Sequence, residues 1–561
     1  MPVLAQADLR LDAGPLDYAL LAVYFVFVLG IGFLARRSVS SSLDFLLSGR
    51  SLPAWVTGLA FISANLGAIE LLGMAANGAQ YGMATVHYYW IGAIPAMVFL
   101  GLVMMPFYYG SKVRSVPEFL RRRFGTGAHL VNALSFAAAQ VLIAGVNLYA
   151  LAFLLNLMLG WPIPFSVVIA AAIVLTYTAL GGLSAAIYNE VLQFFVIVAA
   201  LLPLTIVGLH KVGGWQGLVD KVTAGPGGAE QLSAWPATEL TGIQNPVLSV
   251  IGIVFGLGFV LSFGYWTTNF AEVQRALSAK SMSAARRTPI IGAYPKALIP
   301  FVIIIPGIIA AVVVPELAAL KAGDGSAGVV YNNALPALIG ELLPNGMLGI
   351  AITGLLASFM AGVAANVSSF NTVFTYDLWQ DYVRKDRPDE YYLRVGRLAT
   401  IGGTLVAIGT AFLAAGYGNI MDYIQALFSF FNAPLFATFI LGMFWKRMSA
   451  AAGWTGLVAG TLAAVVVFVL AETGAVDLPG QGASFVGAGA AFVVDIVVSV
   501  AVTMWTRPVP EERLVGLVWS MTPKENRRHS TTGEDAGWYR SPALLGIGVL
   551  VLTVVLNIVF G

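Results

Sequence analysis

Cysteine is absent from the sequence, histidine occurs only four times, and charged residues make up only 10% of the 561 positions. Without cysteine the chain can form no disulfide bond and no thiolate metal site. The histidines, at positions 87, 129, 210 and 529, are far apart and show no metal-ligand spacing. Neither a serine-nucleophile motif nor a phosphate-binding glycine loop occurs. We therefore expect a protein that is not an enzyme.

The scarcity of charge goes with 58% hydrophobic residues, an excess of apolar surface that no soluble core of this length can bury. Apolar stretches of about 20 residues, which suffice to cross a lipid bilayer, recur along the whole chain. Helices must carry them, because unpaired backbone groups are too costly in lipid. We predict an all-α polytopic membrane protein with about fourteen spans. The predicted spans are residues 16–36, 52–75, 84–108, 128–158, 164–182, 188–209, 247–268, 290–314, 346–374, 396–415, 420–442, 451–471, 484–505 and 542–560.

Most of the 30 lysines and arginines lie in alternate loops between these spans. Loops on the cytoplasmic side of membrane proteins are rich in these residues, so both termini are predicted on the non-cytoplasmic side of the plasma membrane. Four of them, Arg10, Lys211, Lys221 and Lys321, lie on the opposite side, and Lys296 lies inside the span 290–314. The net charge of +2 is the sum of the charges on the two sides of the membrane, so it does not indicate a nucleic-acid partner. No obligate protein partner is evident.

Two groups of five spans flank a loop at 210–246, and polar residues interrupt the first span of each group. These residues are Asn65, Gly67 and Glu70 in one span, and Ser262, Gly264, Tyr265, Thr267, Thr268 and Asn269 at the other. Single glycines and serines are common at helix contacts. Paired interruptions, in contrast, are typical of transporters with inverted repeats, whose broken helices bind solute and ions at mid-membrane.

This pattern predicts five divisions of the chain. They are an N-terminal helix with a basic cytoplasmic loop at 1–51, a first inverted repeat at 52–209, an external loop with one short surface helix at 210–246, a second repeat at 247–442, and C-terminal helices at 443–561 that include a cytoplasmic linker at 506–541.

Several short motifs occur in order along the chain. They are SGRSLP (48–53), SAN (63–65), SVPEFL (115–120), GGLSA (181–185), QR (274–275), NTVFTYD (371–377), DYIQ (422–425) and FWKR (444–447). In this order and spacing the sequence resembles the sodium/solute symporter family, and within it the sodium/glucose-type cotransporters. The resemblance implies two inverted five-helix repeats with extra helices at both ends, working by alternating access.

The resemblance also implies a sugar site. The positions that match family sugar-site or gate residues are Asn65, Lys296, Gln425 and the aromatic gate Tyr265. At three further positions the sequence departs from the family: Glu70 replaces a glutamine or histidine, Tyr89 a sugar-binding glutamate, and Ser262 an asparagine. A carboxylate lost at position 89 and gained at position 70 suggests the relocation of one function.

An ionised side chain at mid-membrane costs at least about 2.5–3.5 kcal/mol, so Glu70 and Lys296 are expected to face a water-filled cavity or each other. We expect both to line the substrate cavity and to hydrogen-bond sugar hydroxyls, while Trp266 and its aromatic neighbours offer apolar ring faces. The alternative is a buried ion pair with a purely structural role.

For the coupling ion, the resemblance implies sodium held by the carbonyls of Ser63, Leu66 and Ser358 and by two hydroxyls. The hydroxyl positions correspond to Ala361 and Gly362, which have no side-chain oxygen. Two of about five ligands are therefore missing from the expected site.

A carboxylate is kept nearby, because Glu190 stands where relatives have an aspartate near the inner end of the ion path. Three possibilities stay open: weaker sodium binding, proton coupling through Glu70 or Glu190, and uncoupled transport.

The sequence thus predicts a secondary transporter of a small polar solute, a monosaccharide or similar polyol, coupled to sodium. The alternatives are a proton-coupled or uncoupled carrier of a sugar or organic acid, and a transporter-like solute sensor. A sensor would bind its ligand without net flux, and an enzyme would change the ligand chemically.

Overall fold

The computed structural model describes residues 11–35, 41–324, 328–414, 419–524 and 537–560. Within these ranges the regular structure is helical, apart from an isolated β-bridge between Leu52 and Ala279. The α-helices are α1 Pro15–Ala35, α2 Ser42–Leu47, α3 Ala54–Asn65, α4 Met74–Tyr81, α5 Ile94–Phe99, α6 Met105–Tyr108, α7 Val116–Phe124, α8 Thr126–Leu159, α9 Ile163–Val212, α10 Gly214–Ala224, α11 Thr238–Thr241, α12 Pro246–Ile251, α13 Phe263–Thr268, α14 Phe270–Leu277, α15 Met282–Val313, α16 Pro315–Lys321, α17 Ala334–Leu342, α18 Met347–Thr372, α19 Asp389–Ala414, α20 Ile420–Phe444, α21 Ala450–Glu472, α22 Gly482–Trp505 and α24 Pro542–Phe560.

Shorter 3-10 and π-helical segments join several of these helices. The π-helical segments are η3 Ile69–Gly73, η5 Tyr88–Ala93, η6 Leu100–Met104, η8 Gly252–Ser262 and η10 Val373–Val383. The 3-10 segments are η2 Ser48–Arg50, η4 Gly82–Val86, η7 Ala229–Leu232, η9 Tyr331–Asn333, η11 Glu511–Leu514, η12 Trp519–Met521 and η14 Trp538–Arg540.

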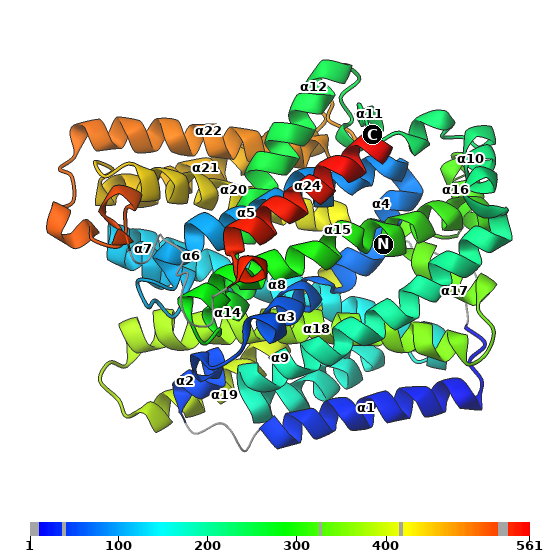
Figure 1. Cartoon of the computed structure of the whole chain (residues 1–561), viewed down its shortest axis with the longest axis horizontal. Helices are drawn as coiled ribbons and strands as arrows, with labels where there is room; N and C mark the ends of the chain where they lie inside the picture. Colours follow the sequence, from blue (N-terminus) through cyan, green and yellow to red (C-terminus); the bar gives the residue numbers. More distant parts are fainter. Residues whose placement is uncertain (1–10, 36–40, 325–327, 415–418, 525–536, 561) are drawn as a thin grey trace.

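The long helices run side by side through the molecule (Figure 1). In the interior, α18 packs against α8 and α9, and α15 packs against α3 and α4. At the periphery, α1 covers one edge of the bundle in the view, and α21 and α22 pair at the opposite edge (Figure 1). This arrangement places α3, α15, α18 and α20 around the centre of the molecule.

Twelve helices of the described chain are long and apolar enough to cross a membrane, and a bent pair brings the number to thirteen. The sequence predicted fourteen, and the difference lies in α9. The predicted spans 164–182 and 188–209 correspond to two helical parts of α9 that meet at a kink, and the first part is apolar only over the shorter stretch Ile163–Thr176. Gly182 interrupts α9 with φ +57°, and a Cβ there would lie 2.5 Å from the Phe45 carbonyl oxygen. Glycine is therefore required, both for its conformation and for the close approach of α2.

Both polar-interrupted helices are broken, as predicted. In the first, Ala54–Asn65 and Ile69–Val86 meet at an angle of 58°. In the second, Asn269 leaves the helical conformation with ψ 112°, and its side chain caps α14 by accepting a hydrogen bond from the Ala271 N–H at 3.0 Å. The division into inverted repeats at 52–209 and 247–442 stays a prediction.

The loop at 210–246 is more structured than the single surface helix predicted for it. It contains α10, η7 and α11. Lys321 at the end of α16 fastens this loop to the core, because its ammonium donates to the Gln231 side-chain oxygen and to the Ala79 carbonyl at the end of α4. The linker at 506–541 is described only in part, since residues 525–536 lie outside the described ranges.

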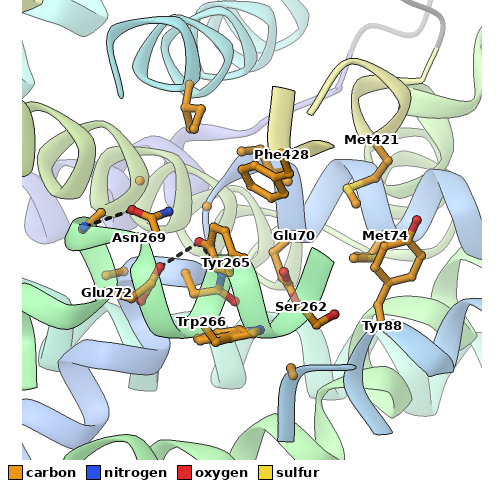
Figure 2. Close-up of a pocket in the computed structure, with 18 of the residues that line it drawn as sticks. Glu70, Met74, Tyr88, Ser262, Tyr265, Trp266, Asn269, Glu272, Met421 and Phe428 are labelled. Carbon is orange, nitrogen blue, oxygen red and sulfur yellow. Dashed lines mark hydrogen bonds between the residues drawn. The ribbon is translucent and has the colours of Figure 1, made fainter. Parts of the chain in front are cut away.

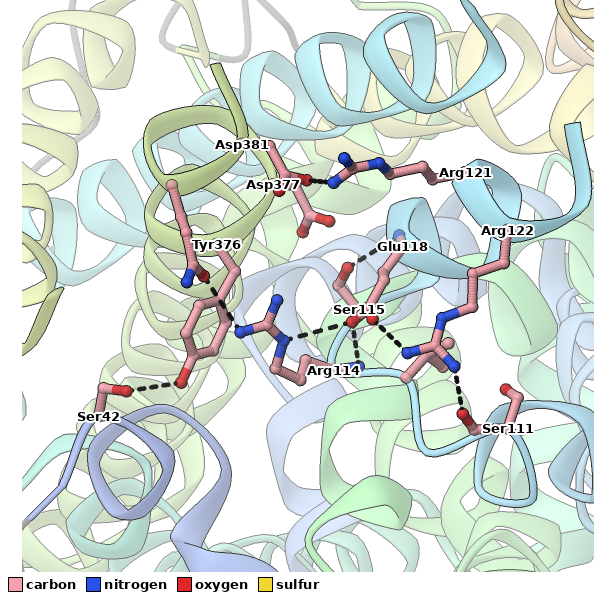
Figure 3. Close-up of polar contacts among 12 residues, drawn as sticks. Ser42, Ser111, Arg114, Ser115, Glu118, Arg121, Arg122, Tyr376, Asp377 and Asp381 are labelled. Carbon is pink, nitrogen blue, oxygen red and sulfur yellow. Dashed lines mark hydrogen bonds and ion pairs between the residues drawn. The ribbon is translucent and has the colours of Figure 1, made fainter. Parts of the chain in front are cut away.

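The basic loop before α7 is an ion-pair cluster as well as a topology signal (Figure 3). Ser115 caps α7 by accepting from the Glu118 N–H at 3.0 Å, and Arg122 donates to the Glu118 carboxylate at 2.6 Å. Burial acts to raise the pKa of Glu118, but Arg114 and Arg122 outweigh it and hold that pKa below its ordinary value. Arg114 also lies 4.1 Å from the centre of the Tyr376 ring. The cluster therefore ties α7 to η10.

Candidate functional site

The two broken helices border a cavity of about 800 Å³, including its opening (Figure 2). All eight residues predicted to bind substrate line it: Asn65, Glu70, Tyr89, Ser262, Tyr265, Trp266, Lys296 and Gln425. They come from α3, η3, η5, η8, α13, α15 and α20. Their role in binding stays a prediction.

Glu70 and Lys296 both line the cavity and form an ion pair with each other. Glu70 stands on the π-helical turn η3 just after the first break, and Lys296 lies on α15; they are 5% and 2% exposed. The ammonium also donates to the Asn65 side-chain oxygen, and it lies 4.7 Å from the centre of the Tyr89 ring and 5.3 Å from that of Trp266. Aromatic faces at this distance stabilise a cation. The lysine is thus held by a carboxylate, an amide and two rings.

A chain of hydrogen bonds continues from this pair to the second broken helix. The Asn65 side-chain N–H donates to the Tyr265 hydroxyl at 3.0 Å. That hydroxyl donates to the Glu272 carboxylate at 2.8 Å (Figure 2). The Tyr265 ring packs against Phe428, with the ring centres 4.7 Å apart. The chain from Glu70 to Glu272 therefore links both breaks through polar contacts.

Sequence reasoning missed Glu272, which also lines the cavity. It lies four residues beyond the predicted span 247–268, and the structure places it in the first turn of α14 at 2% exposure. A lone acidic residue directly after a polar helix break was the signal that could have identified it.

Two amide or carboxylate oxygens at the cavity have no donor among the described residues, Oε1 of Gln425 and Oε2 of Glu272. The hydroxyls of Tyr88 and Tyr89, which also line the cavity, have no hydrogen-bond partner there either. The Lys296 ammonium has three N–H groups, of which the side chains of Glu70 and Asn65 take two. A ligand rich in hydroxyl groups can satisfy the Gln425 oxygen and the third Lys296 N–H, because each hydroxyl both donates and accepts.

The residues predicted for sodium lie at the first helix break and on α18. The Ser358 hydroxyl donates to the Leu66 carbonyl, which is one of the predicted ligands. Ser63 is fully buried, and its hydroxyl has no partner within the described ranges. Ala361 is buried without a side-chain oxygen, and Gly362 lines the cavity.

Asn147 on α8, which sequence reasoning also missed, occupies the space beside Gly362. Its Oδ1 accepts from the Ala68 N–H at 2.7 Å, and its Nδ2 donates to the Ile143 carbonyl at 3.1 Å. A Cβ on Gly362 would lie 2.3 Å from Asn147 Oδ1, and one on Gly67 would lie 2.5 Å from the same atom. Asn147 therefore stabilises the first helix break. Its amide lies beside Gly362, one of the two positions where the resemblance implies a hydroxyl ligand.

Gly362→Ala is expected to destabilise the protein by about 1–3 kcal/mol, the usual range for an overpacked site. The new methyl group must displace the Asn147 amide, which then loses its bond to the Ala68 N–H. Thermal unfolding in detergent measures the effect. The matched control is Gly409→Ala on α19, where a Cβ meets no atom within 4 Å of the described structure.

Asn147→Ala should destabilise the Gly362→Ala variant less than it destabilises the wild-type protein, because the two changes remove the same contact. Equal thermal stability of Gly362→Ala and Gly409→Ala would contradict this account of the site.

Glu190 lies on α9, away from the cavity lining. It forms an ion pair with Arg275 of α14, with Arg275 Nε 3.2 Å from Glu190 Oε2, and both side chains are fully buried. The predicted role of Glu190 in the ion path stays a prediction.

A second polar group involves His129, which sequence reasoning had left without partners. Its Nε2 lies 3.0 Å from an Asp377 oxygen, and the ligand atoms of His129, Asp377 and Asp381 all lie within 4.8 Å of one another. Arg121 pairs with Asp381 and supplies a positive charge to the group (Figure 3). None of these residues is among those that line the cavity.

Comparison with known proteins agrees with this architecture. The family profile "Sodium:solute symporter family" matches residues 45–460. Sodium/glucose cotransporter 4 of Danio rerio is 31% identical over 535 residues, which cover 90% of this chain and 80% of that protein. The sodium/glucose cotransporter of Vibrio parahaemolyticus is 29% identical over 462 residues, which cover 79% of this chain and 83% of that protein.

Among solved structures, a sialic acid symporter coupled to Na+, in a substrate-bound outward-open state, superposes with a TM-score of 0.73. The match covers 89% of this chain and 100% of that one at 20% identity, so it bears on the fold alone. The predicted all-α symporter fold is confirmed.

Proposed function

The chain belongs to the sodium:solute symporter family, and we propose that it carries a monosaccharide or similar polyol across the plasma membrane, driven by a sodium gradient. The observation that carries the proposal is the Glu70–Lys296 pair, set with Asn65 in a cavity between two broken helices. Charged groups form strong hydrogen bonds with hydroxyls, and the Trp266 and Tyr89 rings offer apolar faces to a sugar ring.

The unpartnered oxygen of Gln425 supports a solute that donates hydrogen bonds. A purely apolar solute would leave this acceptor and the remaining Lys296 N–H without partners, which is costly in a buried site. Relatives named sodium/glucose cotransporters support the same class of solute.

The family and the names of these relatives support sodium as the driving ion. For the membrane topology, the distribution of lysine and arginine between alternate loops supports both termini on the non-cytoplasmic side. The protein acts as a multi-pass membrane transporter, and its solute enters and leaves by alternating exposure of the cavity to the two sides.

Uptake of a labelled hexose panel into proteoliposomes tests the proposal. We expect at least one hexose to exchange across the membrane in counterflow, where preloaded unlabelled sugar drives entry of the label without an ion gradient. An inward sodium gradient should then produce accumulation that choline in place of sodium does not. Saturable binding without counterflow would instead identify a sensor, and absence of both would refute the sugar class.

A further inference from the structure

Glu272 is a buried carboxylate that the sugar site does not account for. It lies in the first turn of α14, directly after the break at Asn269, and is 2% exposed. Its Oε1 accepts from the Tyr265 hydroxyl at 2.8 Å, whereas its Oε2 has no hydrogen-bond partner among the described residues. A carboxylate in such a place normally has a cation or several donors.

The positive charges near Glu272 are already engaged with other carboxylates. The titratable groups that interact with it are Tyr265, Arg275, Lys296 and Glu190. Arg275 pairs with Glu190 through two guanidinium nitrogens and also donates to the Ala271 carbonyl at 2.8 Å. Lys296 pairs with Glu70. Each of these pairs, Arg275–Glu190 and Lys296–Glu70, has no net charge. An ionised Glu272 therefore gives this group of residues a net charge of one negative unit.

This excess charge lies beside the second helix break, and polar groups surround it. Asn65, Tyr265 and Asn269 line the same cavity and bring side-chain oxygens to the region. At the family sodium position, by contrast, the Ser358 hydroxyl and the Leu66 carbonyl bond each other, and Asn147 fills the space beside Gly362. The family sodium position therefore lacks two ligand oxygens, whereas the region beside α14 offers an unpaired carboxylate oxygen.

We propose that Glu272 binds the cation that drives transport, a single Na+ or H+, with the Tyr265 hydroxyl as its neighbour. The inference rests on the proposed transport function, since it assigns the ion site of that same carrier. A proton needs no space beyond Oε2 itself, and sodium would draw on Oε2 and on the Tyr265 hydroxyl oxygen.

The site lies where cation and solute can influence each other. The Tyr265 hydroxyl contacts Glu272 on one side and Asn65 on the other, and Asn65 contacts Lys296. A cation at Oε2 of Glu272 draws charge away from Oε1 and so weakens the hydrogen bond that Oε1 accepts from Tyr265. Cation binding thus alters the position of the gate residue and of the groups that face the solute.

Glu272→Gln tests the proposal in the full chain in proteoliposomes. Glutamine keeps the shape and the oxygen that accepts from Tyr265 but removes the charge. Two arms identify the cation: an inward sodium gradient at equal pH on both sides, and an inward proton gradient in sodium-free choline buffer. Counterflow without any gradient reports in parallel whether the variant still binds and moves the solute.

The expected result is that wild-type protein accumulates solute in at least one arm and that Glu272→Gln loses this stimulation completely while counterflow persists. The control is Asp495→Asn on α22, a buried carboxylate whose oxygens accept from Thr438 at 2.8 Å and from Ser499 at 3.0 Å, away from the cavity lining. It should keep the stimulation.

Retention of gradient-driven accumulation in Glu272→Gln overturns the proposal, as does wild-type counterflow without stimulation in either arm. Absence of counterflow in the wild-type protein would instead refute the proposed transport function itself, so the two failures are distinguishable. A Glu272→Gln variant that folds poorly is replaced by Glu272→Asp, which keeps the charge on a shorter side chain and should weaken the dependence on the cation without removing it.

Discussion

Lys296→Met is expected to abolish solute transport and to lower the free energy of unfolding by about 3–5 kcal/mol, the usual effect of removing one partner of a buried ion pair. The change leaves the Glu70 carboxylate buried without its ammonium partner, and it also removes a donor from Asn65. The two rings that now face the ammonium lose their cation as well. Denaturant unfolding in detergent and counterflow of the solute measure the two effects.

The double variant Glu70→Gln, Lys296→Met separates stability from function. Replacement of both partners by uncharged side chains of similar size is often neutral for stability, so most of the loss should be recovered. Transport should stay abolished, because the cavity then lacks the groups proposed to bind the hydroxyls of the solute. Recovery of transport in the double variant would show that the pair has only a structural role.

Lys446→Met gives the reference for an ordinary ion pair. Lys446 pairs with Glu511 at 2.8 Å, and their side chains are 59% and 65% exposed. Exposed pairs contribute about 0–1 kcal/mol. A similar small effect of Lys296→Met would contradict the account of Glu70 and Lys296 as a buried, unscreened pair.

The sequence was informative wherever a polar or charged residue stood in an apolar run. Asn65, Gly67 and Glu70 marked the first break, and the polar group ending at Asn269 marked the second. Such residues are costly in lipid, so their presence in a span indicates a special local structure. The pairing of Glu70 with Lys296 followed from the same reasoning, although the two residues are far apart in the chain.

The features that sequence reasoning missed depend on contacts between distant segments. Asn147 matters because its amide enters the space beside Gly362, on another helix, and no local pattern indicates that approach. Glu272 was overlooked because it lies outside the predicted span, in a segment that reads as a loop. His129 meets Asp377 across 248 positions of the chain. The number of spans differed because the part of α9 before Gly182 is apolar only over the shorter stretch Ile163–Thr176.

Arg275 and Glu190 carry the other large expected effect. Glu190→Gln should destabilise the protein by about 3–5 kcal/mol, because it leaves the Arg275 guanidinium without its counter-ion in a fully buried position. The remaining acceptors of Arg275, the Ala271 carbonyl and the Gln274 side-chain oxygen, are uncharged. Denaturant unfolding in detergent measures the loss, with the exposed Glu511→Gln as the control.

Glu190→Asp and the double change Glu190→Gln, Arg275→Met show what the pair does beyond stability. The aspartate keeps the charge on a side chain shorter by one methylene, so it should retain more stability than Glu190→Gln. The double variant should recover most of the stability, since no unpaired charge stays buried. If Glu190 belongs to the ion path, gradient-driven uptake stays impaired in that stable double variant. Normal uptake there would show that the pair only holds α14, and with it Glu272, against α9.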